Sequence, residues 1–190
     1  MSTAISVTGL SKRTLWRRIA EGVLRTECFS DGSAPQPSHQ TRVALDDALT
    51  ISLLSWGVDD RALMVQADAG LAQAQCDFAL LLLGQAADVE AVVWLRRAAE
   101  QAHLDGMYWL GRCLIAGRGG AVDRHQGVDW VARAANHGHV IALAMVQVLY
   151  DPTGQMLDAA ALDAALDGIE RRVVVQALAE AARELRAVSS

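Results

Sequence analysis

Apolar positions recur at helical spacing along most of the chain from residue 46 onward, and this pattern predicts a series of helices. Two stretches share one arrangement of large and small apolar residues, and they begin at Trp94 and Trp130. Each tryptophan is followed by an Ala-Ala pair four and five residues later and by Ala or Gly at the eighth position. A repeat of this length with small residues at fixed positions is typical of stacked helical hairpins. Since one hairpin cannot bury its own apolar face, several must stack, and the sequence predicts an α-solenoid.

Glycines and helix-capping residues divide this pattern into separate elements. Near the start, Ser2 and Ser11 can each begin a helix, and Gly9 and Gly22 can end them. Gly57, Gly84 and Gly117 are expected to stop the first helix of three hairpins. The helices expected after the first two span residues 46–56, 59–69, 71–83, 88–102, 104–116, 123–137, 140–150, 158–167 and 169–188.

The predicted fold class is mainly α, with a winged helix-turn-helix head followed by the solenoid. We divide the chain into a head (1–45), a solenoid (46–154) and a C-terminal segment (155–190). Apolar residues make up 52% and aromatic residues 5% of the 190 residues, so Ala, Leu and Val must form most of the core, which favours helices. The C-terminal segment can be a polar cap of the solenoid or a dimerisation helix.

Cysteine usage and the start of the chain bear on localisation. Cys28, Cys76 and Cys113 lie far apart and lack metal-ligand spacing, so we interpret them as small core residues in a reducing compartment. The first ten residues lack a signal-peptide pattern, and the apolar run 80–83 is too short to cross a bilayer. We expect a cytoplasmic protein without a membrane segment.

Charge is divided unevenly between the head and the rest of the chain. The whole chain has a net charge of −5, but residues 1–44 contain six basic and three acidic residues, a net +3 that leaves −8 for the remainder. In the second expected helix Leu15 and Ile19 face inward, while Arg13 and Arg17 share the outer face. A basic head on an acidic body favours an anionic partner for the head.

The stretch Thr8-Gly9-Leu10-Ser11-Lys12-Arg13-Thr14-Leu15-Trp16-Arg17-Arg18-Ile19, followed by Glu21-Gly22-Val23-Leu24, resembles the helix-turn-helix of the MerR and excisionase families. The resemblance covers about a quarter of the chain and departs from the family pattern because almost nothing precedes the first helix. It implies a wing, with strands within 24–29 and 40–45 joined by a loop over 30–38. It also implies that double-stranded DNA is a partner.

The residues matching family positions that face the major groove, its flanking phosphates or the wing are Ser11, Lys12, Arg13, Thr14, Trp16, Arg17, Arg18 and Arg42, with Gln40 as a second wing candidate. A helix N-terminus and guanidinium groups suit phosphate oxygens, and Arg can read guanine. The alternative is a solvated basic face on a docking helix. A single head with few phosphate contacts should bind weakly and need a dimer or a second protein.

The repeat units resemble Sel-one-like repeats, which are related to the tetratricopeptide repeat, over about residues 58–154. Besides the two tryptophans and their Ala-Ala pairs, the resemblance rests on Gly70-x-x-x-Ala74, Leu110-Gly111, Gly117-x-Gly119 with Asp123, and Gly138-His139. The turn over 84–88 departs from the pattern, since it is short and lacks a second glycine. The resemblance implies a scaffold that holds a protein partner in a concave surface.

No set of residues predicts catalysis or cofactor binding. His103, His137 and His139 could suggest a metal, but we interpret His103 and His139 as helix-entry residues of the repeats. The turn Gly117-Arg-Gly-Gly120 lacks the preceding strand and the Lys-Ser/Thr of a phosphate-binding loop. Asp46-Asp47 and Asp59-Asp60 suit helix starts. We predict no enzyme activity, no cofactor and no metal.

The leading hypothesis is a DNA-binding transcriptional regulator whose solenoid binds a protein partner or self-associates, with a homodimer as one option. The alternative is a non-catalytic protein–protein adaptor whose basic head caps the solenoid without binding DNA. It would be favoured if Arg13, Arg17 and Arg18 paired with acidic residues of the solenoid. A third and weaker hypothesis is an accessory factor of a phage or plasmid that bends DNA.

Overall fold

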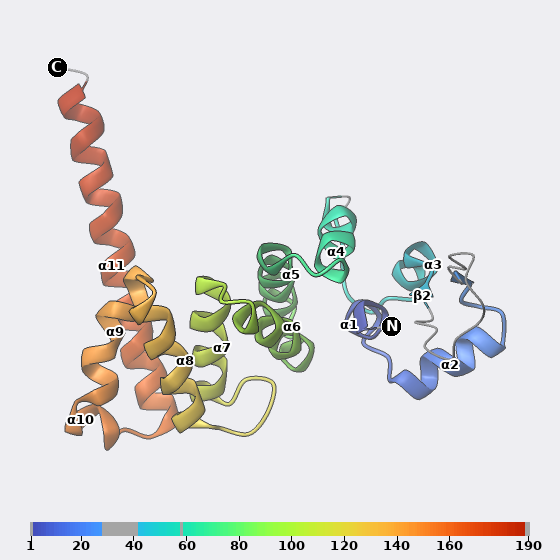
Figure 1. Cartoon of the computed structure of the whole chain (residues 1–190), viewed down its shortest axis with the longest axis horizontal. Coiled ribbons are helices and arrows are strands. Elements are labelled where there is room, and N and C mark those ends of the chain that lie inside the picture. Colours follow the sequence, from blue (N-terminus) through green and yellow to red (C-terminus); the bar gives the residue numbers. More distant parts are fainter. Residues whose placement is uncertain (1, 28–41, 58, 189–190) are drawn as a thin grey trace. The chain divides into compact units, whose positions relative to one another are not determined.

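The computed structural model describes residues 2–27, 42–57 and 59–188. Over these residues the chain is mainly α-helical, which confirms the predicted fold class at that level (Figure 1). The chain forms two compact units, Met1–Ala91 and Val92–Ser190. The predicted boundaries of head, solenoid and C-terminal segment fall inside these units, and the three-part division stays a prediction.

The first unit begins with the two predicted helices, α1 (Ser2–Thr8) and α2 (Lys12–Ala20). Gly9 and Gly22 end them in left-handed conformations, with φ of +66° and +74° that only glycine adopts easily. Strand β1 (Thr26–Glu27) then pairs antiparallel with β2 (Arg42–Val43). These two short strands fall within the predicted ranges 24–29 and 40–45, while the wing itself stays a prediction. Residues 28–41, including Gln40, lie outside the described part.

A small apolar cluster holds these elements together. Leu15 of α2 and Leu24 before β1 are almost completely buried, and Ala4 of α1 packs with them. Ile5, Leu10, Ile19, Val43 and Ile51 surround this cluster. The inward orientation predicted for Leu15 and Ile19 is therefore confirmed.

The helix expected over 46–56 is much shorter. Helix α3 spans Leu45–Thr50, and the chain then leaves the helix at Ser52. The Ser52 hydroxyl donates to the carbonyl of Val7 and accepts hydrogen bonds from the Leu54 N–H (3.1 Å) and the Trp56 indole (2.8 Å). Serine side chains compete with helix hydrogen bonding in this way. The prediction that Gly57 stops this helix was wrong, because the helix has already ended.

Helices α4 (Asp60–Asp68) and α5 (Ala72–Gly84) pack against each other, and α6 (Asp88–Glu100) follows. Their bounds agree with the predicted ones within two residues. The stop after α5 differs in detail, because Gly84 is still helical and Ala86 takes the left-handed conformation at φ 58°. The helix thus ends at Gly84 as predicted, but the left-handed residue beyond its end is Ala86 and not the glycine.

The second unit contains the end of α6 and helices α7 (Leu104–Ala116), α8 (Arg124–Asn136) and α9 (Val140–Tyr150). Gly117 ends α7 at φ +72°, as predicted. The Nδ1 atoms of His103 and His139 accept hydrogen bonds from the backbone N–H of Gly106 and Ala142, both at 3.1 Å. These contacts confirm that both histidines begin helices. Trp94 is completely buried.

The chain ends in α10 (Pro152–Gln155), which was not predicted, and the long helix α11 (Ala159–Val188). Two separate helices over 158–167 and 169–188 were predicted, and this was wrong. Gly168 lies inside α11, where Leu162, Leu166 and Ile169 form one buried stripe across it. Helix α11 packs on α7 and α9, and this packing keeps the helix continuous across the glycine. Among the described residues no helix is both long and apolar enough to cross a membrane.

Candidate nucleic-acid interface

Helix α2 begins at a side-chain cap. The Ser11 hydroxyl accepts a hydrogen bond from the Thr14 N–H at 3.2 Å and contacts the Thr14 hydroxyl at 2.9 Å. This cap uses one of the N–H groups that every helix start leaves without a backbone acceptor. The helix is amphipathic, because Leu15 is buried in the cluster of the first unit while the opposite face is open to solvent.

Seven of the eight predicted site residues follow one another on or beside this helix. Lys12, Arg13, Trp16 and Arg17 are exposed, and Thr14 and Arg18 are half-buried. Trp16 is 44% exposed, so it is a surface residue and not part of the core. The eighth, Arg42, lies in β2, where its backbone pairs with Glu27. The structure thus places four cationic side chains and an exposed indole on one short helix.

Nearby carboxylates neutralise the positive charges of α2 only weakly. Arg17 and Arg18 lie 3.6 Å and 3.7 Å from the Glu21 carboxylate, which belongs to the cap of the same helix. Exposed pairs of this kind contribute little and exchange readily with other anions. Among the described residues Lys12 and Arg13 have no ion-pair partner. The face therefore keeps a positive excess.

Arg25 was not among the predicted site residues, and the structure gives it an anchoring role. Its guanidinium donates to the Asp47 carboxylate at 2.8 Å and 3.0 Å, and its backbone N–H donates to the same carboxylate at 2.7 Å. The hydrogen bonds from the Arg25 side chain, followed by the one from its backbone, lower the pKa of Asp47 to about 2. This contact fixes the start of β1 to α3. The sequence does not predict this pair, because a basic residue before a strand and an Asp at a helix start are both common without pairing.

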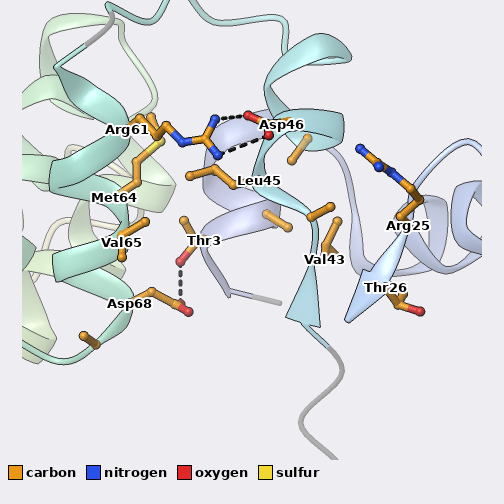
Figure 2. A pocket seen from close by; sticks show the side chains of 14 residues that line it. Thr3, Arg25, Thr26, Val43, Leu45, Asp46, Arg61, Met64, Val65 and Asp68 are labelled. Atoms are coloured by element: carbon orange, nitrogen blue, oxygen red, sulfur yellow. Dashed lines mark hydrogen bonds and ion pairs between the residues drawn. The ribbon is translucent and has the colours of Figure 1, made fainter. Parts of the chain in front are cut away.

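A pocket of about 620 Å³ lies next to this anchor in the first unit. Figure 2 shows that α1, α3, α4 and the hairpin line it, with Arg61 reaching from α4 to Asp46 of α3. On its other side the Thr3 hydroxyl donates to Asp68 at 2.6 Å, and Met64 and Val65 supply apolar walls (Figure 2). These polar groups are paired with one another. The pocket is thus a junction that fastens α1 and α3 to α4.

In the second unit, the buried guanidinium of Arg112 in α7 is the centre of a cluster of charged side chains. Its guanidinium, 7% exposed, donates to Asp163 at 2.7 Å, to Glu170 at 3.1 Å and to Asp167, all of α11. Burial acts to lower the pKa of Arg112, but the hydrogen bonds to Asp163 and Asp167 outweigh it and the pKa is raised. Burial and the hydrogen bond to Glu170 raise the pKa of Tyr108. The cluster holds α11 on α7.

The histidines predicted to be structural lie apart from any metal-like arrangement. His139 stacks on Tyr108 with ring centroids 4.5 Å apart, and its Nε2 lies 3.1 Å from Asp105. Within the described ranges, no group of three or more His, Cys, Asp or Glu side chains is arranged to hold a metal ion. Cys76 and Cys113 are buried, as predicted, and Cys28 lies outside those ranges.

Comparison with known proteins gives no family assignment. Protein-family models, curated proteins and solved structures yield no significant match to this chain.

Proposed function

We propose that the chain is a DNA-binding transcriptional regulator, in which α2 contacts double-stranded DNA and the helical hairpins bind a protein partner or a second copy. The observation that carries this proposal is the outer face of α2. Helix α2 carries three exposed cations, Lys12, Arg13 and Arg17, and the half-buried Arg18 beside them, against one nearby carboxylate, Glu21.

The local geometry supports a winged helix-turn-helix. The left-handed turn at Gly9 joins two short helices, and a two-stranded hairpin follows the second one. A capped helix start with neighbouring guanidinium groups suits phosphate oxygens, and an exposed Arg can form two hydrogen bonds with guanine. In this proposal Ser11, Lys12 and Thr14 position the helix on the phosphates. Arg13 and Arg17 face the base edges, and Arg42 belongs to the wing.

The later helices support a scaffold of Sel-one-like repeats. Small residues lie where α6, α7 and α8 approach closely: Gly106 lies against Ala98 and Ala99, and Gly111 against Gly127. Such close packing of consecutive helices is what a stack of short repeats requires. The function of this part would be to hold a protein partner while the head holds DNA.

The adaptor alternative has one observation in its favour. Thr3–Asp68 and Asp46–Arg61 fasten the head to α4, as expected if the head caps the following helices. None of these contacts involves a cation of α2, however. Arg17 and Arg18 pair with Glu21 of their own helix and, among the described residues, not with acids of α4 or α5. The regulator is therefore the better supported function.

A salt titration of DNA binding tests the proposal. Anisotropy of a labelled random pool of duplex DNA would be measured with the full chain. Four phosphate contacts predict a slope of log K against log salt of about −3 to −4. The double variant Lys12→Ala/Arg13→Ala should bind more weakly with a shallower slope, and Arg183→Ala, which removes an exposed cation from α11, should behave as the wild type. Absence of binding by the wild type at low salt would overturn the proposal.

A further inference from the structure

The C-terminal half of α11 carries an apolar stripe that the chain's own core does not use. Figure 1 shows this half of the helix extending beyond α7, α8 and α9 of the same unit. From Arg171 to Leu185 all residues except the half-buried Val173 are exposed. Leu178 and Leu185 are 66% and 71% exposed and lie on one side of the helix, so they form a contiguous apolar surface.

This stripe is distinct from the face that docks α11. The docked residues Leu162, Leu166 and Ile169 follow one another at helical spacing and lead to Val173. Beyond Val173 the same face becomes polar, with Gln176 donating to Glu180 at 3.0 Å. A second apolar series begins at Val174 and is rotated away from the docked face. It consists of Val174, Leu178, Ala181 and Leu185, at spacings of four, three and four residues, and we name it the tail stripe.

The charged residues around the tail stripe select its partner. Arg171 lies in line with the stripe at its first end, one turn before Val174, and Glu184 lies at the edge of its other end. In a parallel pair of two such helices, Arg171 would face Arg171 of the second copy. In an antiparallel pair, Arg171 of each copy would lie near Glu184 of the other. Opposite charges at opposite ends of one stripe therefore favour an antiparallel second copy.

Side-chain sizes agree with this orientation. When the tail stripe is laid antiparallel on itself, Leu178 lies opposite Ala181 and Val174 lies opposite Leu185. At the centre, Leu178 of each copy then packs against Ala181 of the other, and the two contacts are related by two-fold symmetry. A parallel pair would place two leucines together and leave a gap between two alanines.

We infer that the tail stripe is a self-association surface, through which two copies of the chain form an antiparallel two-helix coil. The inference adds to the proposed DNA-binding function without resting on it. The paired segment, residues 171–188, is about 27 Å long at 1.5 Å per residue. Because so short a coil buries a small area, the dimer forms in a concentration-dependent manner.

Sedimentation velocity of the full chain over a range of concentrations tests the inference. The wild type should pass from monomer to dimer as its concentration rises. Leu178→Lys, in the middle of the stripe, should raise the dissociation constant about tenfold or more. The matched control Gln176→Lys introduces the same charge on the opposite face of α11 and should leave dimerisation unchanged. Circular dichroism would verify that both variants retain their helices.

A charge exchange tests the orientation. Arg171→Glu and Glu184→Arg should each weaken the dimer, and the double variant should restore it, as only an antiparallel pair predicts. A wild type that stays monomeric at the highest concentration, or a dimer insensitive to Leu178→Lys, would overturn the inference. Failure of the double variant to recover would overturn the antiparallel arrangement. Lys12→Ala/Arg13→Ala should leave the dimer unchanged, so loss of DNA binding and loss of dimerisation are separate outcomes.

Discussion

Gly111 of α7 and Gly127 of α8 face each other at backbone contact distance. A Cβ at position 111 would lie 2.7 Å from the carbonyl oxygen of Gly127, and a Cβ at position 127 would lie 2.8 Å from that of Gly111. Both values are too short for any side chain. The two helices can therefore approach this closely only because neither position carries one.

Gly111→Ala should destabilise the chain by about 1–3 kcal/mol, because the added methyl group forces two helix backbones apart. Gly168→Ala is the matched control within α11, where the nearest atom, Nη1 of Arg172, would lie 3.6 Å away. This second variant should be neutral or stabilising by up to about 1 kcal/mol, because Ala favours helix over Gly. Urea unfolding followed by circular dichroism would measure both, and equal effects would contradict the close contact.

The docking of α11 depends on Arg112. Arg112→Ala would leave Asp163, Asp167 and Glu170 close together without their counter-charge. Removing one partner from a buried ionic cluster costs about 3–5 kcal/mol, and the partial exposure of the three carboxylates places the expected loss at the lower end. Hydrogen exchange of α11 amides should increase over residues 159–170. Arg183→Ala, which removes a cation from the exposed half of the same helix, should leave this exchange unchanged.

The Arg25–Asp47 contact should make the stability of the first unit depend on pH in the acid range. The pKa of Asp47 is about 2 in the folded chain against an ordinary value of 3.8. The contact therefore contributes its full stability above the ordinary value, and the contribution is lost as the pH falls from there through 2. Asp47→Asn should be less stable than the wild type at pH 6, and the difference in urea midpoint should shrink towards pH 2. A difference that stays constant over this range would contradict the role of the carboxylate.

The effect of replacing Arg17 on DNA binding should show whether this residue contacts a base or a phosphate. Its exposed pair with Glu21 restrains it little. If Arg17 contacts a base, Arg17→Ala should weaken binding to a selected site by about 1–3 kcal/mol and relax the preference at one position. A uniform loss over unrelated sequences would assign Arg17 to phosphate contact. Unchanged affinity for both would remove it from the interface.

Most helix bounds were predictable from sequence because apolar spacing and capping residues act locally. Ser11, His103 and His139 each cap the helix that follows them, and Gly9, Gly22 and Gly117 each end one. The two largest failures, at α3 and α11, came from long-range contacts. Ser52 ends α3 through bonds that include the carbonyl of Val7, 45 positions earlier in the chain. Gly168 remains helical because α11 docks on α7 and α9, with Arg112 of α7 paired to Asp163 and Asp167 before the glycine and to Glu170 after it.

The candidate site was predictable only in part. The row of cations on α2 follows directly from the sequence, since consecutive residues on one helix stay together. Arg25–Asp47 and Arg61–Asp46 join residues 22 and 15 positions apart, and no local pattern distinguishes them from ordinary surface charges. The network around Arg112 joins residues more than 50 positions apart, and an Arg within an apolar helix was its only signal in sequence.

The buried cysteines give each unit its own reporter of opening. Cys76 and Cys113 are each 1% exposed, and neither forms a disulfide with a described residue. A thiol reagent can reach them only when the surrounding helices separate. The labelling rate of Cys76 therefore follows transient opening of the first unit and that of Cys113 opening of the second. Mass spectrometry of the two peptides would show whether the units open together or independently, without an introduced probe.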